Sequence, residues 1–270
     1  MMMLSPTPNA ESSGAHGETS AELIARLETI ARASDFLARK PLLELESGAR
    51  IERFVFEGPH GGGDPIRIGI FAGIHGDEQA GSHTIVELAS RLVRDPGIAE
   101  GYQIFLYPIC NPAGFDARSR YSASGKDLNR EFWRNSTEPE VILLEREILD
   151  VAFHGLISLH ADDTSPGLYG FVRGAVLARS LLEPALRAAE NILPRNCGAI
   201  IDGFPAENGI ISQCYDGILT SPPKLENTPF EIILETPQHA PEPQQIEAFA
   251  RASLAIFAEY RKFIAFAADL

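Results

Sequence analysis

The sequence predicts a single α/β domain, with a largely parallel sheet covered by helices. Short apolar runs of strand length alternate along the chain with longer segments whose apolar residues recur at helical spacing. No internal repeat and no linker divides the 270 residues. We therefore expect one folded domain over residues 20–270, after a disordered tail, residues 1–19, rich in Ser, Gly and Pro.

The first half of the chain contains two expected helices and three expected strands. Helical spacing of apolar residues predicts helices at Ala21–Leu37 and Gln79–Leu92. Apolar runs predict strands at Ile51–Phe56, Ile66–Gly73 and Tyr102–Ile109. The second and third of these runs are almost continuously apolar, which is typical of strands buried on both faces.

The middle of the chain begins with an expected loop at residues 112–128, which lack periodicity. A helix is expected at Glu138–Phe153, because a proline after Glu138 suits the first turn of a helix. Two apolar runs, Gly155–His160 and Leu168–Val172, predict strands. The segment Val176–Leu193 has helical spacing and is followed by a proline.

The last third of the chain is the hardest to interpret. Residues 196–229 are irregular and contain many Gly and Pro residues. They are followed by an apolar run, Phe230–Glu235, that predicts a buried strand. Apolar residues at helical spacing then predict a closing helix over Glu242–Ala267.

The composition excludes several classes of protein. The net charge of −14 argues against a nucleic-acid partner, because phosphates require a basic surface. No segment reaches the roughly 18 apolar residues of a membrane span, and the N-terminus has no signal-peptide pattern, so we expect a cytoplasmic protein without a membrane partner. Three cysteines without a CxxC pair argue against a disulfide framework or a cysteine zinc site.

Three residues form a candidate zinc site at the carboxyl ends of two expected strands. His75 and Glu78, in GIHGDEQAG, follow one strand, and His160 ends another. Ligand sites form at this edge of a parallel sheet, and two imidazoles with one carboxylate are a ligand set of hydrolytic zinc enzymes. Taken singly, an HxxE pair is usually a surface coincidence and a strand-end histidine is usually a hydrogen-bonded core residue.

Two further groups of residues could bind a substrate near this site. Asn129 and Arg130, in DLNREFW, suit recognition of a carboxylate, and the alternative is a loop with a surface salt bridge. Arg118 and Arg120 lie just upstream and could line the same pocket.

A glutamate at the end of the strand FEIILE is the candidate proton carrier. Beside a zinc-bound water, Glu235 could accept a proton and later pass it to a leaving amine. Glu231, four residues earlier on the same strand, is the competing candidate. Asp162 and Asp163 raise the possibility of a second metal, but a polar loop after the strand is the preferred interpretation.

In this order, these motifs resemble the zinc metallocarboxypeptidase superfamily of the carboxypeptidase A type, which includes the succinylglutamate desuccinylase/aspartoacylase branch. The resemblance covers roughly residues 66–267. It implies a mixed, mostly parallel sheet of about eight strands between helices. It also implies one Zn²⁺ per chain, held by His75, Glu78 and His160.

The resemblance assigns roles to the remaining site residues. Glu235 is similar to the family's general base and acid, and Arg120 to the group that polarises the scissile carbonyl, with Arg118 as the alternative. Asn129 and Arg130 are similar to the residues that hold the substrate's free carboxylate. The family's mobile tyrosine has no secure match, and Tyr215 is the candidate.

The implied function is zinc-dependent hydrolysis of an amide next to a free carboxylate, as in a carboxypeptidase acting on peptides. The alternative is an N-acyl amino acid deacylase. The HGDE motif and the short spacing before DLNR resemble that branch, whereas the 35 residues after Glu235 are more similar to a plain carboxypeptidase domain. A catalytically inactive homologue that binds carboxylate-ended ligands is the third possibility.

Overall fold

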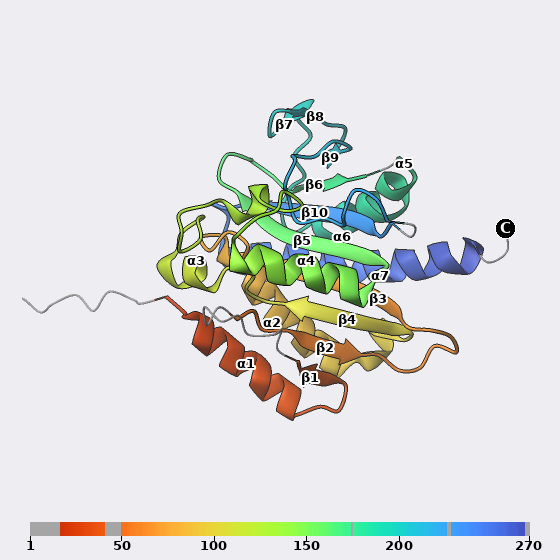
Figure 1. Ribbon diagram of the computed structural model, residues 1–270. Coiled ribbons are helices and arrows are strands. Elements are labelled where there is room, and N and C mark those ends of the chain that lie inside the picture. Colours follow the sequence, from red (N-terminus) through yellow and green to blue (C-terminus); the bar gives the residue numbers. More distant parts are fainter. Residues whose placement is uncertain (1–16, 41–49, 174, 226–227, 268–270) are drawn as a thin grey trace, which may run out of the picture.

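The computed structural model describes residues 17–40, 50–173, 175–225 and 228–267. An eight-stranded mixed sheet lies at its centre, between helices on both faces (Figure 1). Its strands, in spatial order, are β1 (Leu37–Arg39), β2 (Phe54–Glu57), β4 (Tyr102–Tyr107), β3 (Ile66–Ala72), β5 (Gly155–Asp162), β10 (Phe230–Pro237), β6 (Tyr169–Val172) and β9 (Ile210–Ile211). The predicted class, one α/β domain with a mixed and mostly parallel sheet, is confirmed.

The four central strands β4, β3, β5 and β10 run parallel to one another. Their carboxyl ends therefore meet at one edge of the sheet, where ligand sites form in folds of this kind. The register pairs His160 on β5 with Glu235 on β10, so the two side chains lie on the same face of neighbouring strands. Strands β1, β2 and β6 join the sheet through antiparallel pairs.

Two helical layers cover the sheet (Figure 1). On one face, α2 (Gln79–Arg94) packs against α7 (Glu242–Ala267), which also contacts α6 (Glu183–Ala189). On the other face lies α4 (Pro139–Val151), over a core that includes Phe71 and Tyr107, whose rings stack with centroids 4.4 Å apart. Each buried layer fixes one face of the central strands and so holds their carboxyl ends in place.

The first helix, α1 (Ser20–Arg32), starts where a capping box forms. The Glu22 amide donates to the hydroxyl of Thr19 at 3.3 Å, and the Glu22 carboxylate accepts from the Thr19 amide at 2.8 Å. The helix ends five residues before the expected Leu37, which instead begins the short strand β1. Most of the expected disordered tail, residues 1–16, lies outside the described part of the chain.

Two other segments differ from expectation. The expected loop at 112–128 contains α3 (Pro112–Ala117), in which Pro112 occupies the first turn and Asn111 caps the helix by accepting from the Gly114 amide at 2.9 Å. Six residues are too few to show a helical period. The expected helix Val176–Leu193 is divided into α5 (Ala175–Leu177), a π-helical stretch Ala178–Leu182, and α6.

The irregular stretch 196–229 also contains short strands. It forms β9 and a small separate hairpin of β7 (Ile200–Ile201) and β8 (Phe204–Pro205). Two-residue strands leave no alternation to detect in the sequence.

No helix within the described ranges combines the length and apolarity that crossing a bilayer requires. The cytoplasmic location stays a prediction from the sequence.

Replacing Tyr107 by Phe should destabilise the α4 face of the fold. The Tyr107 hydroxyl donates to the buried Glu147 carboxylate at 2.7 Å, and Arg53 also pairs with that carboxylate. Loss of one donor to a buried charge should lower the free energy of unfolding by about 1–2 kcal/mol, measured by urea denaturation. The control Tyr121→Phe, at a side chain that is 51% exposed, should leave stability unchanged. Equal urea denaturation midpoints for the two variants would contradict the stabilising role of the hydrogen bond between Tyr107 and Glu147.

Candidate metal centre and active-site pocket

The segment carrying His75 and Glu78 is a tight turn between β3 and α2. Gly73 has a φ of +62°, a conformation that glycine adopts without strain. A Cβ atom on Gly76 would lie 1.9 Å from the carbonyl carbon of Gly114, so this position has no room for a side chain. The turn is therefore seated directly on α3, which fixes the directions of the His75 and Glu78 side chains.

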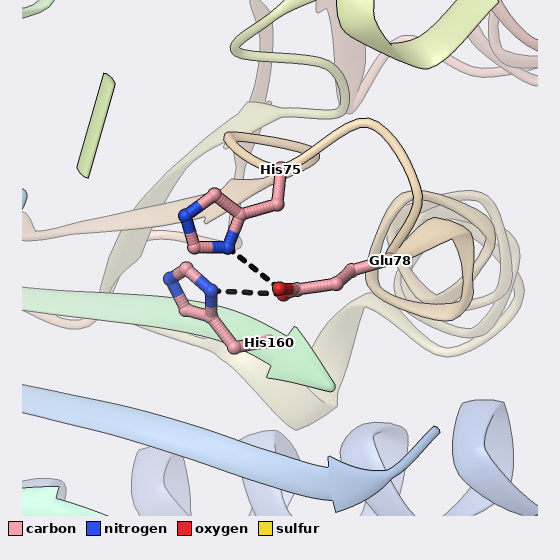
Figure 2. A group of neighbouring side chains, drawn as sticks. All are labelled: His75, Glu78 and His160. Atoms are coloured by element: carbon pink, nitrogen blue, oxygen red, sulfur yellow. Dashed lines mark hydrogen bonds and ion pairs between the residues drawn. The ribbon is translucent and has the colours of Figure 1, made fainter. Parts of the chain in front are cut away.

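The Glu78 carboxylate lies between two imidazole rings (Figure 2). Its Oε1 is 2.6 Å from His75 Nδ1, and its Oε2 is 2.9 Å from His160 Nδ1. The Ala161 amide donates to Oε2 at 3.0 Å. All three side chains are buried, and each offers a ligand atom within 4.8 Å of the others. In the described part of the chain, this is the one group of three or more such side chains that could hold a metal ion.

The outer nitrogens of the two histidines have partners of their own. His75 Nε2 is 3.1 Å from Asp127 Oδ1, and His160 Nε2 is 3.1 Å from the hydroxyl of Ser158. When Nε2 carries the proton and donates to such a partner, Nδ1 keeps its lone pair for a metal. Two Nδ1 atoms and one carboxylate, each oriented by a second contact, fit a zinc ion that keeps an open position for water.

Two buried carboxyl groups in the pocket have pKa values shifted in opposite directions. Burial alone would raise the pKa of Glu78, but the charges of His75 and His160 outweigh it and lower this pKa well below its usual range. Burial, together with the negative charges of Glu78 and Asp162, raises the pKa of Glu235 well above its usual range. Glu78 is thus held ionised, as metal binding would require, whereas Glu235 favours binding a proton.

A pocket of about 270 Å³ opens beside these ligands. Most of the predicted site residues line it: His75, Glu78, Arg120, Asn129, Arg130, His160, Tyr215 and Glu235. The fold therefore brings together, in one pocket, residues that lie up to 160 positions apart and that the sequence analysis had grouped into one site. Glu231, the competing proton carrier, pairs in register with Leu156, further from the carboxyl edge, and is absent from this lining.

The structure places the two candidate arginines differently. Arg120 donates to Asp127 Oδ2 from Nε and Nη2, at 3.0 and 2.9 Å. Its Nη1 lies 3.4 Å from Glu78 Oε1, at the edge of the ligand group. Arg118 points away from the pocket and donates to the backbone carbonyl of Glu18 at 3.3 Å. Of the two, only Arg120 lines the pocket.

Asn129, Arg130 and Tyr215 form a connected wall. Asn129 Oδ1 accepts from the Leu219 amide at 2.8 Å, which leaves the amide nitrogen directed toward His160, 3.5 Å from Nε2. The Arg130 guanidinium lies over the ring of Tyr215, 4.3 Å from its centroid. Tyr215, the candidate for the family's mobile tyrosine, therefore lies next to Asn129 and Arg130, the pair expected to bind a carboxylate.

The two aspartates after His160 have different environments. Asp162 accepts from the Thr164 amide and hydroxyl, both at 2.7 Å, and from the hydroxyl of Tyr169 at 2.8 Å. It is thus engaged by its own loop and by β6. Asp163 lines the pocket and is exposed.

Sequence reasoning missed two residues that orient the histidines. Ser158 lies two positions before His160 on the same strand, so it shares a face with His160, and the period of the strand could have revealed it. Asp127 precedes Asn129 in the DLNR motif, but it comes from a loop. Because loop geometry has no period, nothing in the sequence assigned it to His75.

Part of the chain is similar in sequence to known proteins. Residues 65–162 match the sequence family described as the succinylglutamate desuccinylase/aspartoacylase catalytic domain. Carboxypeptidase SOL1 from Arabidopsis thaliana is 30% identical over 103 residues, which are 32% of this chain and 21% of that protein. The matched part of the chain thus spans about a fifth of the length of this curated relative.

Several solved structures share the fold. A protein from Shewanella baltica OS155, classed as a metallopeptidase, has a TM-score of 0.74 and 22% identity, with 88% of this chain and 91% of that chain covered. A metallo-carboxypeptidase from Burkholderia cenocepacia has a TM-score of 0.69 and 18% identity, with 91% of this chain and 70% of that chain covered. A metallo-carboxypeptidase from Pseudomonas aeruginosa, in complex with (2-guanidinoethylmercapto)succinic acid, has a TM-score of 0.64 and 19% identity, with 87% of this chain and 67% of that chain covered.

Replacing Asp127 by Ala should weaken metal binding without unfolding the protein. The substitution removes the partner of His75 Nε2, and loss of such a second contact typically reduces metal affinity by roughly 10–100-fold. Zn²⁺ affinity is measured by competition with a chromophoric chelator. The exposed Asp150→Ala on α4 serves as the control and should bind Zn²⁺ like the unmodified protein. An unchanged affinity in Asp127→Ala would rule out the orienting role.

Proposed function

We propose that this chain hydrolyses an amide bond next to a free carboxylate group, since it is similar over residues 65–162 to the succinylglutamate desuccinylase/aspartoacylase catalytic domain and shares its fold with a metallo-carboxypeptidase. The main support is one arrangement: three buried ligand side chains with Glu235 in register beside His160, in one pocket with Arg120, Asn129 and Arg130. A volume of about 270 Å³ suits a small substrate or the end of a peptide.

His75, Glu78 and His160 would hold the zinc ion. When bound, zinc supplies a Lewis acid and lowers the pKa of a coordinated water molecule. Asp127 and Ser158 keep the two imidazoles in the orientation that this binding requires.

Glu235 is the proposed general base and acid. It reaches the pocket from the end of β10, where burial and nearby carboxylates favour its protonated form. In its ionised form this carboxyl accepts the proton of the attacking water, and its raised pKa increases its affinity for that proton. It then delivers the proton to the leaving amine. Because one carboxyl group can carry out both proton transfers, no second acid or base residue is needed in this mechanism.

Arg120 and the pair Asn129–Arg130 complete the proposed site. Arg120 is held by Asp127, and its Nη1 lies next to the ligand group, where it can donate to the oxygen of the scissile carbonyl. Arg130 and Asn129 would bind the free carboxylate, with Tyr215 packed on the arginine. These groups place the amide between the metal and Glu235.

The first candidate substrate is the C-terminal residue of a peptide. The metallo-carboxypeptidase from Pseudomonas aeruginosa binds a derivative of succinic acid, a small dicarboxylate, and shares this fold. An N-acyl amino acid is the second candidate, favoured by the family match over residues 65–162. In both, the leaving amine belongs to an amino acid with a free carboxylate, so the two substrates differ only on the acyl side.

Purified protein should contain about one Zn²⁺ per chain and should lose its hydrolytic activity when a chelator removes the metal. Metal analysis and a panel of C-terminal peptides and N-acyl amino acids test this together. Activity confined to N-acyl amino acids would select the deacylase. Stoichiometric zinc without turnover on the whole panel would instead support a ligand-binding homologue.

The variant Glu235→Gln should bind Zn²⁺ normally, because Glu235 is not in the ligand group. Its kcat should fall by roughly 10²–10⁴-fold, the usual contribution of a positioned proton carrier. Steady-state kinetics with the best panel substrate measure the loss. As a control, Glu207→Gln removes an exposed carboxylate outside the pocket and should keep full activity. Full activity in Glu235→Gln would overturn the mechanism.

A further inference from the structure

Arg130 reaches the active-site pocket without a carboxylate partner from the protein. Its side chain is partly buried and lines the pocket. Its Nη1 donates to the neighbouring Asn129 carbonyl at 2.7 Å, and within the described ranges no acidic side chain forms an ion pair with it. A guanidinium has five N–H donors, so most of them remain available to a ligand. Another contact must therefore hold this group in position.

The ring of Tyr215 provides that contact. The guanidinium carbon of Arg130 lies 4.3 Å from the ring centroid, the geometry of a cation–π interaction. The ring of Phe204 meets Tyr215 edge to face, with centroids 4.8 Å apart and 79° between the two planes. Phe204 in turn meets Phe171 on β6, with centroids 5.9 Å apart. The guanidinium is thus supported by a chain of aromatic rings that ends in the pocket wall.

The hydroxyl of Tyr215 is engaged by the hairpin of β7 and β8, which packs beside β6 and β9 (Figure 1). It is 3.0 Å from the carbonyl oxygen of Asp202 and 3.0 Å from Asp202 Oδ1. Asp202 and Gly203 have φ values of +49° and +78°, the left-handed conformations of a two-residue hairpin turn. Burial and the hydrogen bond with Asp202 raise the pKa of Tyr215, so the hydroxyl keeps the proton that it donates.

These contacts limit what the hydroxyl can do for a substrate. A phenol has one proton and donates one hydrogen bond at a time. Turning the hydroxyl toward a substrate would break its bond to Asp202. Moving the ring with it would also remove the contacts of Tyr215 with Arg130 and Phe204. The arrangement therefore favours a role for the ring over a role for the hydroxyl.

We propose that Tyr215 is a positioning residue, whose ring directs the Arg130 guanidinium toward the substrate's carboxylate while its hydroxyl stays on Asp202. A mobile tyrosine would instead swing to the substrate and donate to it. Because the ring sets the direction of a planar fork of donors, its loss should weaken the binding of a carboxylate and leave the rest of the ligand unaffected.

This inference rests on the proposed function, because it concerns the carboxylate of the same substrates. The test uses the zinc-loaded Glu235→Gln variant, which should bind substrates without cleaving them. The probes are N-acetyl amino acids and N-benzoylglycyl dipeptides that end in phenylalanine, lysine or glutamate. Each is paired with the primary amide of its α-carboxyl group, which lacks the charge. Calorimetric titration gives the Kd of every probe, and the ratio of amide Kd to acid Kd measures the contribution of the carboxylate.

At least one acid should bind roughly tenfold or more tightly than its amide, the usual gain of hydrogen bonds to a charged group. Adding Tyr215→Phe, which keeps the ring, should change this ratio by less than about twofold. Adding Tyr215→Leu, which removes the aromatic face, should lower the ratio by roughly three- to thirtyfold and leave the Kd of the amide unchanged. The control Tyr121→Leu makes the same change at a side chain that is 51% exposed and should keep the ratio.

Three results would overturn the inference. A ratio that falls equally in Tyr215→Phe and Tyr215→Leu would assign the role to the hydroxyl. A ratio that is unchanged in Tyr215→Leu would show that the ring does not position Arg130. Equal affinities of acid and amide in every pair would show that Arg130 binds no carboxylate. Should Tyr215→Leu not fold, Tyr215→Gln removes the aromatic face in its place and carries the same expectation.

Turnover by the unmodified protein is measured separately on the same acids. The expected pattern of Kd ratios without turnover would refute the proposed hydrolase while supporting the role of Tyr215. Turnover together with a ratio that is lost in Tyr215→Phe would support the hydrolase and refute the role of the ring.

Discussion

The buried carboxylate of Glu78 joins two parts of the molecule, the turn after β3 and the end of β5. It contacts His75 from its own turn, His160 from the end of β5, and the amide of Ala161. An isolated charge at this depth would be strongly unfavourable, so each of these contacts is needed for the fold as well as for the site. The parallel pairing of β3 with β5 brings the two histidines to one edge, and the lack of space at Gly76 fixes the turn that carries His75.

Much of the fold and site could be predicted from the sequence, because both depend on long apolar runs. Strands β3, β5 and β10 were visible as such runs, and the parallel arrangement then placed His160 and Glu235 at one edge. The roles proposed for these residues come from the resemblance of the whole series of motifs to a known family, which no single motif could have indicated. The pocket lining agrees with the grouping of most of them.

The remaining features depend on geometry without a period in the sequence. Arg118 and Arg120 are two positions apart, but the left-handed conformation of Arg118 at the end of α3 turns its side chain toward Glu18. Asp127 contacts His75 across 52 positions of chain, through a loop. The buried carboxylate of Glu231 accepts two hydrogen bonds from Ser221, which lies in an irregular segment. Such contacts follow from packing of irregular segments, which local patterns do not encode.

The outer wall of the pocket has a small hydrophobic core of its own. Tyr169, Phe171, Ile201 and Ile211 form a cluster separate from the two large cores beneath the sheet, and Phe204 packs against it. Ile201, Phe204 and Ile211 of this group belong to a segment that contributes none of the three candidate metal ligands. The sequence of this wall can therefore change separately from the three candidate metal ligands, and protein engineers can randomise residues 200–211 without replacing any of the candidate site residues.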